Sequence, residues 1–492
     1  MSLFTMTAHE LKDKLLSREI SAMELLDSVY GQIEGVEPQV QAYITLTKEL
    51  AQEQAKAVDE GFQRGSAQAG AGIPIAIKDN ISVAGVPNTC ASKMLANYRP
   101  PFHATVVEKL IAAGMPILGK TNMDEFATGS SSESSWYHPT RNPWDLARVP
   151  GGSSGGSAAA VSAGEAIWAL GTDTGGSLRQ PAAFCGVVAL KPTYGLISRY
   201  GVVAVASSLD HVGPVTKDVT DCALLLQRIA GYDGRDSTSA QEEIPDYASY
   251  LQTNIRGLRV GVPKEFLSLD GLDGEVRQGV ERAIKLYEEL GAAIIEVTLP
   301  HIHQALSVYY IIMSAEASSN LGRYDGVRYG YRCEDAGDTV SMFSQTRSEG
   351  FGPEVKRRIL LGTYLLSSGQ YETYYRQAQR ARTLIARDFQ QAFAQCDVIL
   401  GPTVPTTAFE LGARRDDPLE MYQSDIYTAP VNLAGLPAMS VPCGLDSSGL
   451  PMGLQLIGPH FGEGTLLKAA YAYEQASGHY RLRAPVEVKN NG

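Results

Sequence analysis

Residues 149–184 read VPGGSSGGSAAAVSAGEAIWALGTDTGGSLRQPAAF, in which a glycine–serine loop at 151–157 is followed by a second loop at 174–177. The apolar run AIWAL before the second loop predicts a buried strand. Consecutive glycines allow a tight turn and direct successive backbone N–H groups toward one point, which is typical of an oxyanion-binding site. Ser177 is therefore a candidate nucleophile, although a simple turn with a capping serine is the plainer explanation of this loop alone.

Strands and helices alternate on both sides of these loops. In GIPIAIKDN, residues 72–80, the isoleucines occupy alternate positions, which predicts a strand with Lys78 on its opposite face. A helical pattern begins near residue 273 and ends near Gly291, between two later strands. This alternation predicts an α/β protein with a large sheet covered by helices on both faces. The further strands are expected within 112–122, 257–263, 292–300, 396–405 and 438–444.

The order of these elements divides the chain into four expected parts. Thr7-x-x-Glu10 and Ser21-x-x-Glu24 are capping boxes followed by apolar residues at helical spacing, which predicts helices that pack on the main body or face another subunit. The polar stretch 239–247 is the best candidate for a seam between subdomains. We expect an N-terminal helical segment, a catalytic part of the core, an inserted substrate-pocket subdomain and a C-terminal part of the core, at 1–66, 67–235, 236–430 and 431–492.

The composition is that of a folded protein that does not itself bind nucleic acid strongly. The 492 residues are 44% hydrophobic and carry a net charge of −12, whereas a phosphate backbone is bound by clustered Lys and Arg. Six scattered cysteines without a CxxC pair favour reduced thiols and a cytoplasmic location. We expect no signal peptide, and the sequence has no run of ~18 apolar residues, the length of a membrane span. His301 and His303 are expected in a loop, and no metal site is predicted there.

Two short motifs match well-known active-site patterns, but their surroundings do not support either one. Residues 114–121 match the phosphate-loop pattern GxxxxGK[ST], yet the residues between the glycines are apolar and include a proline, which indicates a strand and a turn. Residues 151–155 match GxSxG, a nucleophile elbow that directly follows a strand, whereas the polar and proline-containing NPWDLARVP precedes this one. The sequence therefore predicts neither an ATP site nor such an elbow.

A serine nucleophile needs a base, because its hydroxyl is weakly reactive until it loses its proton. No histidine lies near the two loops in the sequence, although a distant histidine can fold back to them. Lys78 is the other candidate, since burial at the end of an apolar strand lowers the pKa of an amine. A decrease from ~10.4 to ~7.5 requires about 4 kcal/mol from the surroundings. Most lysines at strand ends are solvated, so this pattern alone makes Lys78 a candidate and no more.

Together, GIPIAIKDN, GGSSGGSAAAV and GTDTGGSLRQPA resemble the signature blocks of the amidase signature family, in the same order. The resemblance implies that family's fold, with a large mixed sheet, and amidase chemistry without a cofactor on this chain. It implies that Ser177 attacks an amide carbonyl, that Ser153 transfers the proton and that Lys78 is the final base. It also implies a cis peptide bond between Gly152 and Ser153, and an oxyanion hole formed by the amides of Thr174, Gly175, Gly176 and Ser177.

Further blocks resemble one branch of this family, the A subunits of tRNA-dependent amidotransferases. They include KTNMDEFATGSSSESS, RYDGVRYGYR, EVKRRILLGTY and YTAPVNLAGLPAMSVPCG. The resemblance implies that the chain hydrolyses glutamine and passes ammonia to a B subunit, which uses ATP and Mg²⁺ to activate Glu on tRNA(Gln) or Asp on tRNA(Asn). A small C subunit completes the implied heterotrimer, and the charged tRNA is contacted mainly through the B subunit.

A glutamine pocket must pair both charges of the free amino acid, because a buried charge without a partner is costly. The blocks that resemble the branch make Arg358 a candidate for the carboxylate and Asp425 a candidate for the ammonium, with Tyr309 closing the pocket. The sequence leaves Arg357 and Tyr310 as alternatives to their neighbours. An ordinary ion pair or a core tyrosine is the other explanation for each residue.

Two other functions fit parts of the same pattern. A free-standing amidase would turn over small or aryl amides as an isolated chain and would be indifferent to glutamine. The chain could instead be a catalytically inactive scaffold protein, in which case Ser177→Ala would leave glutamine-dependent transamidation by the complex unchanged. The complete set of Lys78, Ser153 and Ser177 argues against a scaffold. The choice between Glu-tRNA(Gln) and Asp-tRNA(Asn) is expected to lie mainly with the partners.

Overall fold

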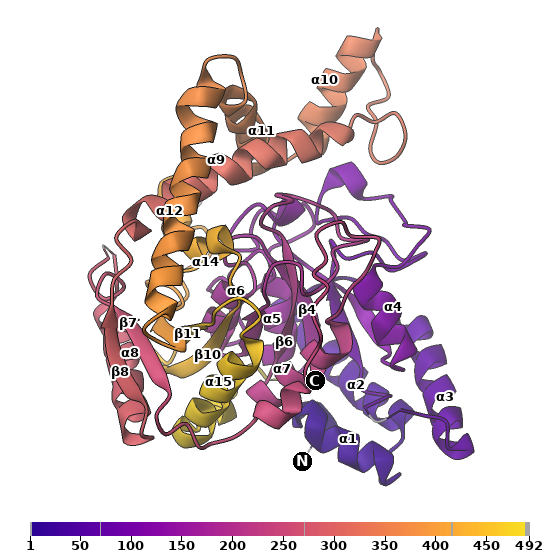
Figure 1. Ribbon diagram of the computed structural model, residues 1–492. Helices are drawn as coiled ribbons and strands as arrows, with labels where there is room; N and C mark the ends of the chain where they lie inside the picture. The colour runs from indigo at the N-terminus through magenta and orange to yellow at the C-terminus, as the bar shows by residue number, and fades with distance from the viewer. Residues whose placement is uncertain (1, 69, 270, 415–416, 488–492) are drawn as a thin grey trace.

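An eleven-stranded mixed sheet runs through the computed structural model, which describes residues 2–68, 70–269, 271–414 and 417–487 (Figure 1). The strand order is β1-β3-β2-β4-β6-β5-β10-β11-β9-β7-β8, so neighbours in the sheet are often distant in the sequence. This architecture confirms the predicted α/β fold. The strands are β1 (Tyr43–Leu46), β2 (Ile75–Lys78), β3 (Ile117–Thr121), β4 (Trp168–Asp173), β5 (Val188–Lys191), β6 (His211–Thr216), β7 (Arg259–Pro263), β8 (Ala293–Val297), β9 (Val398–Pro402), β10 (Ala438–Leu445) and β11 (Pro451–Ile457).

Helices cover both faces of the sheet. α5 and α6 pack together, and α6 lies against β5, β10 and β11. α7, α8 and α15 form a second group that packs on the other face (Figure 1). The helices are α1 (Ala8–Leu16), α2 (Ala22–Val40), α3 (Lys48–Arg64), α4 (Thr105–Ala112), α5 (Gly155–Ser162), α6 (Arg179–Cys185), α7 (Val219–Ile229), α8 (Gly274–Glu289), α9 (Ile302–Asn320), α10 (Thr339–Gly350), α11 (Pro353–Leu365), α12 (Arg376–Phe393), α13 (Pro418–Gln423), α14 (Ala429–Ala434) and α15 (Glu463–Ser477).

The N-terminal segment is helical, as predicted, apart from one strand. Both capping boxes are formed, with Thr7 at the start of α1 and Ser21 at the start of α2. The prediction of helices alone over 1–66 is wrong for β1, which follows α2. That helix ends at Gln41, whose φ of 56° lies in the left-handed region, and the next residues pair antiparallel with β3. The partner strand supplies their backbone hydrogen bonds, which the local sequence does not reveal.

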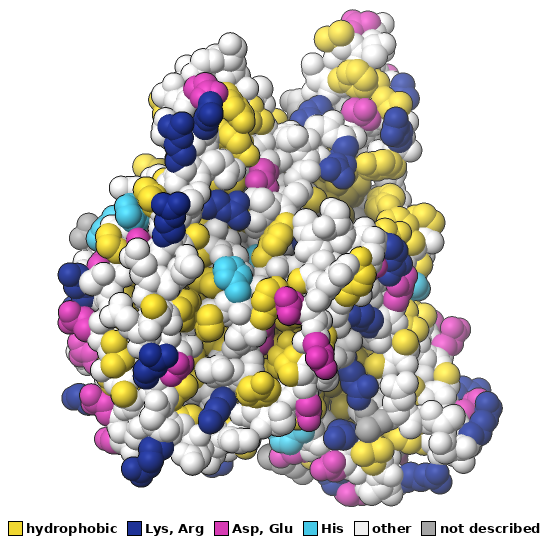
Figure 2. Space-filling model, in the orientation of Figure 1, with side chains coloured by type: hydrophobic (Ala, Val, Ile, Leu, Met, Phe, Trp, Pro, Cys, Tyr) yellow, Lys and Arg dark blue, Asp and Glu magenta, His cyan; other side chains and the backbone are white. Residues whose placement is uncertain are grey.

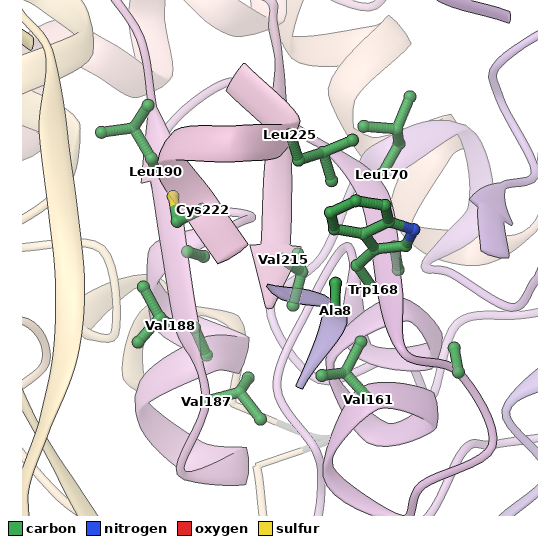
Figure 3. Packing of buried hydrophobic residues seen from close by; sticks show 14 of the residues in the cluster. Ala8, Val161, Trp168, Leu170, Val187, Val188, Leu190, Val215, Cys222 and Leu225 are labelled. Atoms are coloured by element: carbon green, nitrogen blue, oxygen red, sulfur yellow. The ribbon is translucent and has the colours of Figure 1, made fainter. Parts of the chain in front are cut away.

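The central strands are buried on both faces, which explains their nearly continuous apolar sequences. Trp168 and Leu170 of β4 and Val188 and Leu190 of β5 belong to one hydrophobic cluster with residues of α7 (Figure 3). Each fully buried leucine or valine stabilises the folded state by about 1.5–3 kcal/mol relative to an exposed one. The result is a rigid central sheet whose strand ends hold the loops at fixed positions.

The register of three central strands brings Lys78 and the loop after β4 to one edge of the sheet. β2 is parallel to β4, with Ile75 opposite Trp168 and Ile77 opposite Leu170. The carboxyl ends of parallel strands meet at the same edge, so Lys78 at the end of β2 lies beside the loop that follows β4. β6 is antiparallel to β4, so the residues that precede β6 reach the same edge.

Helices α9 and α11 lie toward the far end of the molecule from the N-terminus, and α12 runs from there back toward the sheet (Figure 1). α9 packs against α11, α12 and α14. Tyr309 lies on α9 and Arg358 on α11, while Asp425 lies between α13 and α14. Within the described part of the chain, no helix combines the length and the apolar character that a membrane span requires.

Candidate active site

Lys78 ends β2 as a fully buried amine surrounded by hydroxyl groups. Its Nζ lies 2.8 Å from each of Ser153 Oγ, Ser154 Oγ and Thr172 Oγ1. Burial lowers the pKa of Lys78 to about 7, against the opposing effect of nearby Asp124. Much of the amine is therefore uncharged near neutral pH and can accept a proton.

Ser153 follows a cis peptide bond from Gly152, as the family resemblance implies. The Gly152 N–H donates to Gln180 Oε1 at 2.8 Å, which ties this loop to α6. A Cβ atom at position 152 would lie 1.9 Å from Asp124 Oδ2, so only glycine fits there. These constraints hold the Ser153 hydroxyl where Lys78 reaches it.

Ser177 lies between β4 and α6, beside the loop of Ser153. The Ser154 N–H donates to the Ser177 carbonyl oxygen at 3.1 Å, so the backbones of the two loops are in contact. Ser177 is 8% exposed, whereas Lys78 and Ser153 are fully buried. In the chain as described, no hydrogen bond engages the Ser177 hydroxyl. Lys78 and Ser153 are therefore in direct contact, and Ser177, the residue of the three nearest to solvent, lies on an adjacent loop.

The backbone amides around Ser177 divide into engaged and free donors. The Gly176 N–H donates to Asp173 Oδ1 at 2.9 Å. Among the described residues, the amides of Gly175 and Ser177 have no such acceptor. A Cβ atom at position 175 would lie 2.3 Å from Cζ of Tyr309, which shows how closely that ring approaches the loop. The Thr174 amide also has no acceptor among the described residues, so the amides of Thr174, Gly175 and Ser177 are available to another acceptor. The Gly176 amide, which was also expected in the oxyanion hole, is already engaged by Asp173.

A buried ion pair between Asp173 and Arg179, which the sequence analysis did not identify, joins the two ends of the Ser177 loop. Arg179 binds Asp173 through two contacts of 3.0 Å, from Nε and Nη2. Burial alone would raise the pKa of Asp173, but Arg179 holds it well below its ordinary range. Arg179 Nη1 also donates to Gln455 Oε1 of β11 at 2.7 Å. Both residues lie within the segment 149–184, yet nothing in the sequence pattern of that segment indicates that they form an ion pair.

Arg358 is the buried member of the two candidate arginines. Its guanidinium lies 4.4 and 4.3 Å from the ring centroids of Tyr310 and Tyr422, which are themselves stacked 4.2 Å apart. Its Nε donates to Glu354 Oε1 at 2.7 Å. Its Nη1 is buried without a hydrogen-bond partner. Arg357, by contrast, is 47% exposed and pairs with the same glutamate at the surface. Arg358 therefore offers an unused donor inside the protein.

Asp425 is buried near this arginine and accepts hydrogen bonds from two hydroxyls. Tyr310 donates to its Oδ2 at 2.6 Å, and Ser130 donates to its Oδ1 at 3.3 Å. Burial raises the pKa of Asp425 to about 7, although Tyr310 and Arg358 favour the charged form. The two candidate tyrosines thus have different contacts, since Tyr309 packs on the Ser177 loop and Tyr310 binds Asp425.

Hydrogen bonds connect the surroundings of Asp425 to both serine loops. The Ser130 carbonyl accepts from Gln180 Nε2 at 3.0 Å, and the same glutamine side chain holds the Ser153 loop. On the other side, Thr428 Oγ1 donates to the Gly175 carbonyl at 2.6 Å. Residue types alone could not identify Ser130, Gln180 or Thr428, because their roles depend on contacts between distant segments.

The two motifs dismissed from the sequence have the predicted structures. The segment 114–121 forms a turn and then β3, and Lys120 is fully buried with Nζ 3.1 Å from Asp79 Oδ1. No strand directly precedes 151–155, because the residues before it form turns and bends and α5 begins within it. Neither segment has the strand–turn–helix arrangement that the matching motifs require.

Three potential metal ligands cluster away from this site. His9 Nδ1 lies 3.0 Å from Asp221 Oδ1 and 3.6 Å from Asp218 Oδ2. The carboxylates also accept backbone N–H groups and join α1 to the start of α7. The loop predicted for His301 and His303 is wrong for His303, which lies in α9. His301 is the turn residue that precedes this helix, and its N–H donates to Asp388 Oδ2 at 2.7 Å.

The comparison with known proteins agrees with the signature blocks. The model of the amidase family matches residues 24–467. The chain belongs to the amidase family. Among its relatives, the A subunit of glutamyl-tRNA(Gln) amidotransferase from Caldanaerobacter subterraneus subsp. tengcongensis is 60% identical over 97% of both chains. The protein of the same name from Desulforudis audaxviator is 58% identical over 99% of this amidase and 98% of its own length.

Solved structures place this amidase among proteins of the same fold. The A subunit of glutamyl-tRNA(Gln) amidotransferase from Thermotoga maritima is 41% identical and superposes with a TM-score of 0.80 over 99% of both chains. The peptide amidase of Stenotrophomonas maltophilia is 30% identical, with a TM-score of 0.83 over 98% of this chain and 99% of its own. The expected family and fold are confirmed.

Proposed function

We propose that this amidase hydrolyses glutamine as the A subunit of a tRNA-dependent amidotransferase. The alignment with proteins of that name at 60% identity supports this role over that of an independent amidase, since the peptide amidase is only 30% identical. The observation that carries the proposal is the 2.8 Å contact of Lys78 with Ser153, beside the Ser177 loop and close to a pocket with one carboxylate and one guanidinium.

In the proposed reaction, neutral Lys78 takes a proton from Ser153 as Ser153 takes the proton of Ser177. Ser177 Oγ bonds to the side-chain carbonyl carbon of glutamine, and the C=O electron pair moves to the oxygen, toward the amides of Gly175 and Ser177. When the C–N bond breaks, the proton returns through Ser153 to the nitrogen and ammonia leaves. Water then repeats these steps on the acyl-enzyme, releasing glutamate and restoring Ser177.

The pocket charges support a free amino acid as substrate. Arg358 has an unused Nη1 donor for the α-carboxylate, and the Asp425 carboxylate would pair with the α-ammonium. An amide that lacks these charges would leave the Arg358 Nη1 donor unsatisfied and the Asp425 carboxylate without an ammonium to pair with, which is costly in a buried site. Tyr309 and Tyr310 line the path between the pocket and the Ser177 loop through their contacts with Gly175 and Asp425.

The remaining steps of the proposed function lie on other chains. A B subunit would receive the ammonia and activate Glu on tRNA(Gln), or Asp on tRNA(Asn), with ATP and Mg²⁺, and a C subunit would complete a cytoplasmic heterotrimer. On the face drawn in Figure 2, Lys and Arg side chains are interspersed with Asp and Glu. Because binding a tRNA backbone requires clustered Lys and Arg, this mixed surface and the net charge of −12 support a complex in which the partner makes most contacts with the charged tRNA.

Copurification followed by an ammonia-release assay tests the proposal. The tagged full-length chain, expressed from its native locus, is expected to retain two further subunits and to release ammonia from glutamine. Ser177→Ala should abolish that release while both partners remain bound. Rapid hydrolysis of small or aryl amides by the chain alone, with no activity on glutamine, would support a free-standing amidase instead.

A further inference from the structure

The loop 174–176 is fixed at each of its three residues by a different partner. The Gly176 N–H donates to Asp173, which immediately precedes the loop, and the Gly175 carbonyl accepts from Thr428 at 2.6 Å. Thr174 Oγ1 donates to Asp210 Oδ1 at 2.7 Å. Asp210 therefore holds the side chain of Thr174, the residue whose carbonyl belongs to the same peptide unit as the Gly175 amide.

The sheet itself places Asp210 opposite Thr174. β4 and β6 are antiparallel, and the last pair in their register is Asp173 with His211. The residue after β4 consequently faces the residue before β6 at the edge of the sheet where the serine loops lie. Thr174 is 3% exposed and Asp210 is 7% exposed, so water does not compete freely for their hydrogen bond.

Asp210 is itself held by contacts that do not involve the Ser177 loop. Its Oδ2 accepts from the backbone N–H groups of Val205 at 2.9 Å and Ala206 at 3.1 Å. Ser208 of the same turn binds α9 and α12 through Glu316 and Arg382. One carboxylate oxygen is thus anchored on a turn fixed to the helices, while the other oxygen receives the Thr174 hydroxyl.

We propose that Asp210 is a positioning residue for the oxyanion-binding loop and acts through the Thr174 hydroxyl. This inference rests on the proposed function, in which the Gly175 and Ser177 amides receive the oxyanion. The hydrogen bond keeps the loop aligned before the substrate carbonyl becomes charged, which is the condition for strong transition-state stabilisation. Its loss lowers kcat, whereas the glutamine charges still bind Arg358 and Asp425 and KM is retained.

A double-mutant cycle tests the inference by ammonia release from glutamine, using the full chain with the proteins that copurify with it. Thr174→Val removes the hydroxyl at nearly constant volume, and Asp210→Ala removes the carboxylate that accepts from it. We expect each variant to lower kcat about 10- to 100-fold with KM unchanged. The double variant should be no worse than the more impaired single variant, because both changes break one hydrogen bond. Thr174→Ser keeps the hydroxyl and should restore activity to within about threefold.

Additive losses would overturn the inference, because Asp210 would then act only by holding the turn at Val205 and Ala206. Should Asp210→Ala fail to fold, as judged by its melting temperature, the comparison of Thr174→Val with Thr174→Ser tests the inference alone. Equal kcat in Thr174→Val and Thr174→Ser would also overturn the inference. Ser177→Ala distinguishes a failure of the proposed function from a failure of this inference. Activity in Ser177→Ala would refute the proposed function. An inactive Ser177→Ala together with additive losses in the cycle would refute only the role of Asp210.

Discussion

Lys78 and Lys120 are buried on adjacent parallel strands, but their surroundings give them different chemistry. Lys120 has the Asp79 carboxylate 3.1 Å away, whereas within the described residues Lys78 has only hydroxyl and carbonyl oxygens in hydrogen-bonding reach. A carboxylate partner would favour the charged amine. Burial lowers the pKa of both amines, but at Lys120 the hydrogen bond and charge of Asp79 oppose it. At Lys78 burial lowers the pKa to about 7, which leaves the amine able to act as a base.

The pH dependence of kcat/KM for glutamine follows from two buried groups with pKa values of about 7. Lys78 must be neutral to accept a proton and Asp425 must be ionised to bind the ammonium, so both are inactivated as the pH falls below 7. The logarithm of kcat/KM should fall with a slope approaching about two per pH unit at low pH. Asp425→Asn should reduce the slope to about one, and a slope unchanged by this substitution would remove Asp425 from the pH profile.

Gly152→Ala tests the fit of the Ser153 loop. The added Cβ would lie 1.9 Å from Asp124 Oδ2, so the loop must move and Ser153 must leave Lys78. We expect kcat to fall at least about 100-fold, as an error of about 1 Å in catalytic geometry produces. Gly274→Ala is the matched control, because nothing lies within 4 Å of the added atom at the start of α8, and its activity should be unchanged. An active Gly152→Ala enzyme would contradict the proposed proton path.

At the scale of elements, the junction between β4 and α6 places the Ser177 loop. Asp173 ends the strand and Arg179 begins the helix, and their ion pair closes the loop between them. Arg179 also reaches Asn432 on α14 and Gln455 on β11, so one side chain links four elements. The loop is consequently supported by the core and not by its own turn alone.

Arg179→Met should destabilise the fold by about 3–5 kcal/mol, because it leaves the Asp173 carboxylate buried without its charged partner. Urea unfolding followed by circular dichroism measures this change. Arg259→Met provides the control, since Arg259 is 45% exposed in its pair with Asp397 and should cost at most about 1 kcal/mol. Equal losses in the two variants would show that the buried pair has no special role in stability.

The sequence predicts the elements better than their arrangement. Alternating or continuous apolar runs located β2, β3, β4 and β7 to β10, because burial on a pleated sheet requires those side chains. The capping boxes located two helix starts for the same local reason. The position of β6 beside β4, the Asp173–Arg179 pair and the contact of Asp210 with Thr174 all depend on partners that sequence spacing does not reveal.

At the scale of the whole molecule, one sheet and one helical extension bring together a site from most of the chain. Lys78, Ser153 and Ser177 come from the sheet edge, whereas Arg358 and Asp425 come from the region around α11 and α14. The family resemblance predicted this pocket set, and the burial of Arg358 distinguishes it from Arg357. A partner that contacts α11 could therefore alter the pocket without touching the serines.

Glutamine hydrolysis by the isolated chain should be weak and should rise about tenfold or more when the partner proteins, ATP and charged tRNA are present. The reason is that the pocket residues lie on helices outside the rigid sheet, where a partner can change their alignment. Steady-state ammonia release with and without each component measures the effect. Full activity of the isolated chain, unaffected by any addition, would contradict the proposed role within a complex.

The central claim is that Ser177 carries the acyl group after its proton passes through Ser153 to Lys78. The most direct measurement is peptide mass spectrometry of the complex quenched with acid during glutamine turnover. The account predicts a γ-glutamyl ester on the peptide that contains Ser177, absent in Ser177→Ala and greatly reduced in Lys78→Ala. An acyl group found on another residue, or continued glutamine hydrolysis by Ser177→Ala, would contradict it.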